Sequence, residues 1–248
     1  MTSLINSKVM LLICGHGSKD INFKISFINF VNKISKLFLN LKVDYCYIEI
    51  NEPMIENSFK RNAINFKHII FLPTLIFKGK HLKLDIISKL KILSDKFSTD
   101  VLIIDNIELG RNIVSIYEKK ISNEISKKNK YALITCTSFS KDKNLEKTSQ
   151  KYTHELSYKL KISYFQNFQF NNEQIVIDKL KLAIKNKEIN KIILHPIFFF
   201  DGFLYKEIIR KFEDNFKNII YITKPFLEEP EIINIFREKI LTKIKLFQ

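Results

Sequence analysis

Residues 9–20 read VMLLICGHGSKD, and this stretch decides the fold of the first half of the chain. An apolar run of strand length stops at a Gly-His-Gly-Ser turn and gives way to residues with helical spacing. In a parallel α/β protein, the loop at the carboxyl end of a strand is where ligands bind. His16, held between two glycines in that turn, is therefore a candidate for contact with a ligand.

A second stretch, HIIFLPTLIFKGKHLKLDI at residues 68–86, repeats this arrangement. Its apolar strand closes at Pro73, and Gly79 and His81 follow before a helical pattern begins. Imidazole is the commonest side-chain ligand for borderline divalent metals, and the first and third strands of a wound sheet can bring such loops together. We therefore predict that His16 and His81 hold a divalent metal with open coordination positions.

Apolar runs of strand length alternate with helical spacing along the whole chain. Continuous apolar strands are typical of a parallel sheet covered on both faces. We predict an α/β protein in two halves, each a four-stranded parallel sheet with helices on both faces. The expected strands are 8–14, 43–49, 67–73, 100–105, 131–136, 161–166, 190–196 and 218–222, and the expected helices are 20–40, 54–65, 81–97, 110–128, 144–160, 172–187, 203–216 and 229–246.

The two halves resemble each other in sequence as well, which indicates an internal duplication. The segment 14–20 aligns with 136–142 at an offset of 122, and the segment 73–79 aligns with 196–202 at an offset of 123. A polar stretch, SNEISKKNK at 122–130, is the candidate boundary. The expected domains are 1–128, which carries the metal site, and 129–248, which is a degenerate repeat.

This duplication separates structural requirements, which both copies share, from residues that serve one copy. His16 aligns with Ser138 and His81 aligns with Leu204, so the second copy lacks both imidazoles. The Pro, Gly and Lys-Asp positions remain in both copies. The two histidines are therefore the strongest candidates for function.

Carboxylates follow the second predicted strand, in the sequence IEINEP at 48–53. Glu49 lies nearest to the strand end and can complete the shell of a metal or accept protons from an incoming ligand. Glu52 is the other candidate. The competing interpretation is a solvated loop acid that caps the helix beginning near Pro53.

Backbone amides after the first and third strands are further candidate contacts. The GHGS turn matches neither of the common phosphate-loop patterns, so we expect no nucleotide. Exposed amides at a helix N-terminus can still bind a substrate carboxylate, and we assign this purpose to Gly17, Ser18 and Gly79. The other histidines, His68, His154 and His195, are predicted to be structural or on the surface.

Composition limits the partners. The chain has 248 residues, 46% of them hydrophobic, which is enough for a sizeable core. Its formal charge is +15, but the lysines are spread along nearly every predicted helix, and heavy use of Ile, Asn, Lys and Phe is typical of an A/T-rich coding sequence. Since neither an RNP motif nor a clear recognition helix is present, nucleic-acid binding is the weaker interpretation.

Cysteines and apolar runs indicate the compartment. Cys14, Cys46 and Cys136 are widely spaced within strand-like runs, which predicts buried thiols in a reducing environment rather than disulfides. No run approaches the roughly 20 apolar residues of a membrane span, and the first apolar run is too short for a signal peptide. We expect a cytoplasmic protein without a membrane partner.

Six segments resemble a known family, the sirohydrochlorin chelatases of the long, two-repeat cobaltochelatase type. The paired His-Gly-Ser and Gly-x-His motifs at this spacing are fairly specific for class II chelatases. Four segments resemble the first half of that family and two resemble its degenerate second half, so the resemblance covers nearly the whole chain. They are LLICGHGSKD (11–20), VDYCYIEINEP (43–53), FLPTLIFKGKHLKLDI (71–86) and DNIELG (105–110), then TSFSKDKNLE (137–146) and HPIFFFDGFLYKEI (195–208).

The resemblance implies two flavodoxin-like halves and insertion of Co²⁺ or Fe²⁺ into sirohydrochlorin, without ATP, at a cleft between them. It places His16 and His81 on the family's metal-binding and catalytic histidines. Glu49 or a histidine would help to remove the two pyrrole N–H protons, and the surplus of Lys and Arg would complement the carboxylates of the macrocycle. Lys19 stands where the family usually has Arg, and the second repeat lacks the Gly-Arg-Gly-Ser often found there.

Several alternatives remain open from the sequence. Cobalt insertion for cobalamin biosynthesis is the favoured interpretation, iron insertion for siroheme is its nearest rival, and nickel is a lesser option, because histidine and carboxylate ligands accept all these ions. A non-catalytic carrier of tetrapyrrole or metal belongs to a different class. A basic nucleic-acid-binding protein would show steeply salt-dependent binding. We expect the chain to act as a monomer, since its two halves are already fused.

Overall fold

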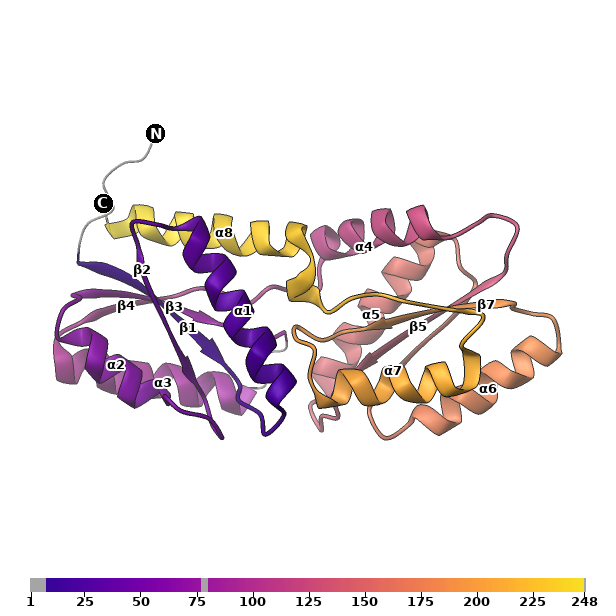
Figure 1. The fold of residues 1–248 in the computed structure, drawn as a ribbon, viewed down its shortest axis with the longest axis horizontal. Helices are drawn as coiled ribbons and strands as arrows, with labels where there is room; N and C mark the ends of the chain where they lie inside the picture. The colour runs from indigo at the N-terminus through magenta and orange to yellow at the C-terminus, as the bar shows by residue number, and fades with distance from the viewer. Residues whose placement is uncertain (1–7, 77–79, 248) are drawn as a thin grey trace. The chain divides into compact units, whose positions relative to one another are not determined.

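The computed structural model describes residues 8–76 and 80–247, without the side chains of residues 80–83. The chain forms two compact units, Met1–Ile107 with Pro230–Gln248, and Glu108–Glu229. Each unit contains a four-stranded sheet whose strands are all parallel (Figure 1). The predicted α/β class, with one parallel sheet in each half, is confirmed.

The first unit has the strand order β2-β1-β3-β4. Helices α1 and α8 cover one face of its sheet, and α2 and α3 cover the other (Figure 1). Its elements are β1 (Val9–Gly15), α1 (Ile21–Leu37), β2 (Lys42–Tyr47), α2 (Ile55–Ala63), β3 (His68–Pro73), α3 (Lys80–Phe97), β4 (Asp100–Ile103), α8 (Pro230–Ile244) and the 3₁₀ helix η2 (Lys245–Phe247).

The second unit repeats this topology with the strand order β6-β5-β7-β8. Helices α4 and α5 cover one face, and α6 and α7 cover the other (Figure 1). Its elements are α4 (Arg111–Glu124), β5 (Tyr131–Thr137), α5 (Lys143–Leu160), β6 (Tyr164–Gln169), α6 (Glu173–Lys185), β7 (Lys191–Pro196), α7 (Phe203–Phe216), β8 (Ile220–Ile222) and the 3₁₀ helix η1 (Phe226–Glu228).

These compact units do not coincide with the predicted domains 1–128 and 129–248. Helix α4 ends the first sequence repeat but packs on α5 in the second unit. Helix α8 ends the second repeat but packs on α1 and β3 in the first unit, where the rings of Phe30 and Phe236 lie 5.4 Å apart. The two repeats have therefore exchanged their last helices, and each sheet is covered by a helix from the other repeat.

The central strand of each sheet is the core of its unit. Every residue of β1 is buried, and its side chains alternate between the two sheet faces. Met10, Leu12 and Cys14 join the apolar cluster on the α2 and α3 side. All three cysteines of the chain are free and buried, as predicted.

The equivalent core of the second unit contains a buried polar layer. The side chain of His195 is fully buried between the Tyr152 hydroxyl, 2.8 Å from Nε2, and the Thr223 hydroxyl, 2.6 Å from Nδ1. Burial lowers the pKa of His195 to about 3, so this imidazole is neutral in the folded protein. Leu72 occupies the corresponding position of the first repeat. His195 is therefore structural, as predicted.

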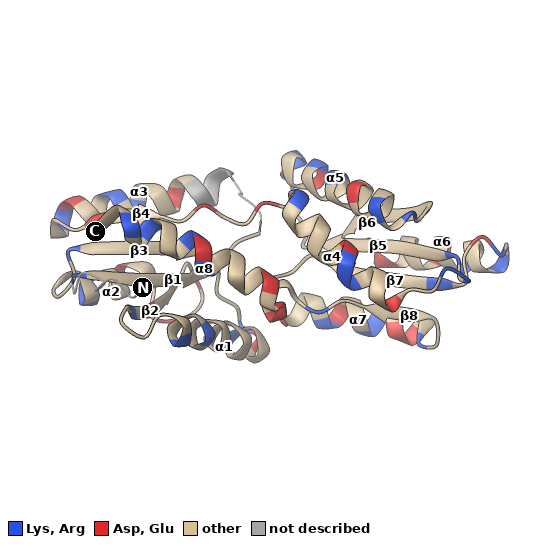
Figure 2. Ribbon diagram, turned by 90° about the horizontal axis from the view of Figure 1, so that it is seen from above, with Lys and Arg blue, Asp and Glu red and all other residues tan. Residues whose placement is uncertain are grey.

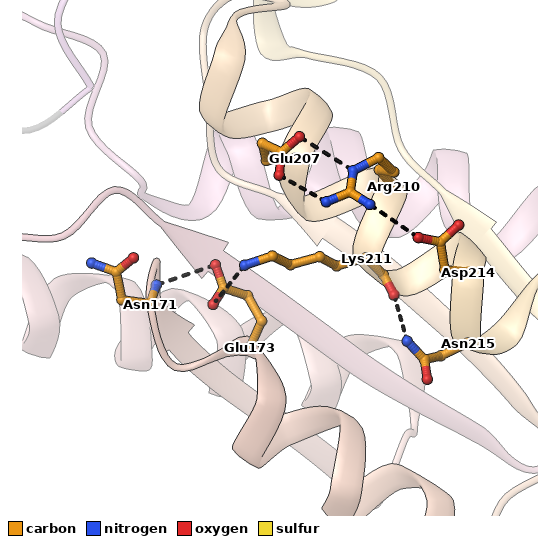
Figure 3. A network of polar contacts seen from close by, with 7 residues as sticks. All are labelled: Asn171, Glu173, Glu207, Arg210, Lys211, Asp214 and Asn215. Carbon is orange, nitrogen blue, oxygen red and sulfur yellow. Dashed lines mark hydrogen bonds and ion pairs between the residues drawn. The ribbon is translucent and has the colours of Figure 1, made fainter.

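A network of ion pairs joins α6 to α7 in the second unit (Figure 3). The buried carboxylate of Glu173 accepts the amide of Asn171 at 3.1 Å and lies 3.5 Å from Nζ of Lys211. Arg210 pairs with the acidic residues one turn before and one turn after it on α7. The Glu173 contacts hold the start of α6 against α7, while the exposed Arg210 pairs add little stability.

Charged residues are spread over both units. Lys and Arg occur on the helices of each unit with Asp and Glu among them (Figure 2). This distribution agrees with the expectation that the excess of basic residues is not gathered in one block. None of the described helices has both the length and the apolar character needed to cross a bilayer.

We expect Phe236→Ala to destabilise the first unit by about 3–5 kcal/mol, because it removes a fully buried ring that packs on Phe30. Denaturant unfolding followed by circular dichroism measures this loss. Asn234→Ala, at an exposed position of the same helix, is the control and should change the free energy of unfolding by less than about 0.5 kcal/mol. Equal effects of the two substitutions would contradict the packing of α8 on this unit.

The buried imidazole also predicts a pH dependence. Because the pKa of His195 falls from 6.5 in the unfolded chain to about 3 in the folded protein, only the unfolded chain binds a proton between these values. Stability should therefore fall as the pH falls, by roughly 2 kcal/mol between pH 6.5 and 5. His195→Leu should lose this slope, although it is less stable at neutral pH because two hydroxyls lose their partner. Exposed His154→Leu should keep the wild-type slope; identical slopes in all three proteins would refute the assignment.

Candidate functional site

The carboxyl end of β1 brings His16 and Glu49 together. The carbonyl of Gly15 accepts the amide of Ile48 at 2.9 Å, and the carbonyl of His16 accepts the amide of Glu49 at 3.1 Å. These bonds continue the pairing of β1 with the chain after β2. The two side chains meet above them, with His16 Nδ1 and Glu49 Oε1 3.4 Å apart. Their side chains are 45% and 55% exposed, so both can be reached by a ligand.

Gly17 is required by this arrangement. Its φ is +101°, in the region that favours glycine, and a Cβ atom there would lie 1.8 Å from the carbonyl oxygen of Glu49. The backbone of the loop after β1 therefore runs directly against the backbone of Glu49. Gly17 thus sets the approach of the two loops, and its predicted contact with a substrate carboxylate stays a prediction.

Ser18 has a structural role that both repeats share. Its amide donates to Asn51 Oδ1 at 2.7 Å, and its hydroxyl accepts the amide of Asp20, which caps α1. In the second unit, Ser140 makes the same two kinds of bond. Its amide donates to the side chain of Gln169, and its hydroxyl accepts the amide of Asp142. The amide of Ser18 is therefore bonded within the protein, and its predicted contact with a substrate carboxylate stays a prediction.

Glu49 and Glu52 are separated by the shape of their loop. The carboxylate of Glu52 accepts the amide of Met54 at 2.8 Å and the side-chain amide of Asn57 at 3.1 Å. It therefore stabilises the start of α2, where the positive end of the helix dipole favours an acid. The capping interpretation thus applies to Glu52, and Glu49 is left beside His16.

The loop after β3 is attached to the same end of β1. Thr74 donates both its amide and its hydroxyl to the carbonyl of Cys14, at 2.8 and 2.9 Å. His81 lies in the first turn of α3, but its side chain is outside the described residues, as is all of Gly79. The predicted convergence of His81 with His16 therefore stays a prediction. Within the described residues, no group of three or more His, Cys, Asp or Glu is placed to hold a metal.

Asn51 and Thr74 are the site residues that sequence reasoning missed. Each fixes a loop through a bond to a backbone group far away in the sequence. Tyr47, at the end of β2, is fully buried, and burial raises the pKa of its phenol to about 12.

The remaining histidines do not belong to this site. His68 begins β3 and lies 3.0 Å from the carboxylate of Asp100, with its ring against Phe247. His154 is exposed on α5 and meets the edge of Phe165. Both placements confirm the prediction that they are structural or on the surface.

Gly17→Ala should displace the loops from each other, because the added Cβ overlaps the Glu49 carbonyl and the φ is strained. We expect a loss of about 1–3 kcal/mol in stability and a change in the environment of His16. Thermal unfolding and the imidazole NMR signals of His16 measure the two effects. Gly110→Ala is the matched control, since no atom lies within 4 Å of its added Cβ. A Gly17 variant with wild-type stability and spectra would show that the loops do not need this approach.

About half of the chain matches known proteins in sequence. A sequence model described as CbiX matches residues 10–124. The sirohydrochlorin cobaltochelatase of Sulfolobus acidocaldarius is 32% identical over 117 residues, which are 47% of this chain and 92% of that protein. Both matches concern about one repeat.

Solved structures match over both repeats. SirB from Bacillus subtilis subspecies spizizenii, a sirohydrochlorin chelatase in complex with cobalt, has a TM-score of 0.74 at 17% identity and covers 96% of both chains. SirB from Bacillus subtilis with Fe³⁺ has a TM-score of 0.75 at 17% identity and covers 94% of both chains. At this identity, the likeness shows a shared two-unit fold. The sequence match establishes the relationship: the chain belongs to the CbiX family, together with the sirohydrochlorin cobaltochelatase of Sulfolobus.

Proposed function

We propose that this protein inserts Co²⁺ into sirohydrochlorin, without a nucleotide, as a sirohydrochlorin cobaltochelatase of cobalamin biosynthesis. Family membership supports the reaction class, because the Sulfolobus relative carries that name. The observation that carries the proposal is the pairing of His16 with Glu49 at the open end of β1. An imidazole and a carboxylate at that place can bind a divalent ion that must later be transferred to the macrocycle.

Glu49 has a definite part in this proposal. It faces Nδ1 of His16 at 3.4 Å, so the ring can present Nε2 to a metal ion. A carboxylate on the far nitrogen fixes the ring orientation and raises the basicity of the bound nitrogen. His16 thus holds the ion, Glu49 positions His16, and His81 is the expected second imidazole.

Metal insertion also requires the removal of two protons from the macrocycle. As the metal–nitrogen bonds form, two pyrrole N–H bonds break and their protons pass to bases. The carboxylate of Glu49 is 55% exposed and can accept a proton there. The formal charge of +15 favours the approach of a macrocycle that carries several carboxylates.

Iron is the second candidate metal, with siroheme as the product. The SirB structures hold cobalt in one case and Fe³⁺ in the other, and a CbiX structure is described as the terminal enzyme of siroheme biosynthesis in denitrifying bacteria. Imidazole and carboxylate ligands accept both ions. Parallel assays with Co²⁺ and Fe²⁺ under exclusion of oxygen decide between them.

The central test mixes the purified protein with sirohydrochlorin and Co²⁺ and follows the absorbance change of the macrocycle. We expect His16→Ala and His81→Ala each to lower the insertion rate by about 100-fold or more, because an ion ligand is lost. Glu49→Gln should lower it by about 10–100-fold, because it weakens the orientation of His16 and removes a carboxylate that can accept a pyrrole proton. His154→Ala, at an exposed histidine elsewhere, should keep the wild-type rate.

Thermal unfolding of each variant shows whether the fold is kept. Wild-type rates in both histidine variants would refute the proposed roles. A protein that binds sirohydrochlorin or Co²⁺ without raising the insertion rate would instead be a carrier.

A further inference from the structure

Two exposed phenylalanines stand out in the second unit. Phe139 and Phe203 are each 59% exposed. Among the described phenylalanines, one other, Phe165 on β6, is exposed, at 40%. Single apolar side chains at a surface are ordinary. These two, however, occupy related positions in the fold.

Phe139 and Phe203 both follow strands that are neighbours in the sheet. Strands β5 and β7 pair in parallel, with Cys136 opposite Pro196. Phe139 lies in the loop after β5, and Phe203 is the first residue of α7, after the β7 loop. The chain leaves β5 toward one side of the sheet and β7 toward the other, so these loops flank the switch point, where parallel α/β sheets bind ligands.

Comparison of the two repeats shows that Phe139 is not needed for the loop. It aligns with Gly17, whose lack of a side chain is required in the first unit. In the second unit, the loop is still held by the bond from the Ser140 amide to Gln169 and by the cap that Asp142 places on α5. The hydrogen bonds that hold the loop are shared by the two units, while the position of the buried Gly17 in the first unit is occupied by an exposed aromatic ring in the second.

Polar groups accompany the two rings. The hydroxyl of Thr137, at the end of β5, and Oδ1 of Asp201, two residues before α7, are buried without a hydrogen-bond partner among the described residues. Nζ of Lys206 lies 3.6 Å from the other carboxylate oxygen of Asp201, and Lys141 is exposed two residues after Phe139. Ligand sites combine apolar surface with a small number of polar groups, and basic groups beside them favour a ligand that carries acids.

We infer that Phe139 and Phe203, one after each of these paired strands, bind the flat conjugated face of the tetrapyrrole, with Lys141 and Lys206 near its carboxylates, and we call the two rings the aromatic patch. This assignment rests on the proposed function, which supplies a planar polycarboxylate as substrate. It gives the second repeat a role in substrate specificity after the loss of its imidazoles. The patch binds the ligand and takes no part in the proton or metal transfer.

The test measures binding of metal-free sirohydrochlorin to the full chain by the change in the absorbance or fluorescence of the macrocycle. Phe139→Ala and Phe203→Ala should each weaken binding by about 3- to 10-fold, and the double variant should weaken it by about 30-fold. In the Co²⁺ assay, KM should rise by similar factors while kcat changes by less than about threefold. Phe139→Tyr should restore binding because it keeps a flat ring. Phe165→Ala is the matched control and should bind as the wild type does.

The outcomes separate this inference from the proposed function. If the wild type inserts Co²⁺ and the double variant binds the macrocycle with unchanged affinity, the patch is refuted and the function stands. If the wild type binds the macrocycle but inserts no metal, the function fails and the two alanine variants still decide the patch. If the wild type binds no macrocycle at all, both are refuted. A fall in kcat at unchanged KM would assign the rings to a step after binding and would also overturn the inference.

Discussion

The carboxyl end of β1 is the point on which the site depends. The carbonyl of His16, just beyond β1, accepts the amide of Glu49, and the last two carbonyls of β1 itself accept hydrogen bonds from Thr74 of the loop after β3 and from Ile48 of the chain after β2. Because β1 is buried along its whole length, these carbonyls would otherwise lack partners. Pairing them fixes both loops, and His16 is presented beside an acid as a result. The site is therefore a product of backbone bonding at the middle of the sheet.

The second unit keeps the hydrogen bonds that hold these loops but differs in the residues of its core. A serine and an aspartate hold the loop after β5 as they do after β1. The face of the sheet toward α5, by contrast, has become polar, with His195 in the place of Leu72 and Thr135 in the place of Ile13. Thr135 lies 2.6 Å from the hydroxyl of Thr153, so the layer is internally bonded. Duplication thus preserved the loops and allowed the core and the outward residues to change.

Most of the fold could be predicted from the sequence, because covered parallel strands and amphipathic helices leave strong periodic signals. Some boundaries of strands and helices differ from the prediction where the backbone conformation of a single residue decides them. For example, β6 begins at Tyr164 and not at residue 161, since Lys161 ends α5 with a φ of 57°. The exchange of α4 and α8 could not be predicted. An amphipathic pattern states which face of a helix is buried and does not state which sheet buries it.

The candidate site was predictable in part. His16 and Glu49 were found because strand ends are readable from the sequence. The separation of Glu49 from Glu52 was not readable, since it depends on Ile50 adopting a φ of 68° between them. The use of the Ser18 amide by Asn51 was equally hidden, because nothing local links the two positions.

The exchanged helices have a consequence for synthesis of the protein. Helix α8 is synthesised after every element of the second unit, yet it covers a sheet whose strands are synthesised before them. During translation, α1 alone covers this face of the first sheet until the whole second unit has been made. We expect chaperone contact during that interval at the surface of α1 that carries Phe30, and the second unit, which ends at Glu229, can finish folding before the first.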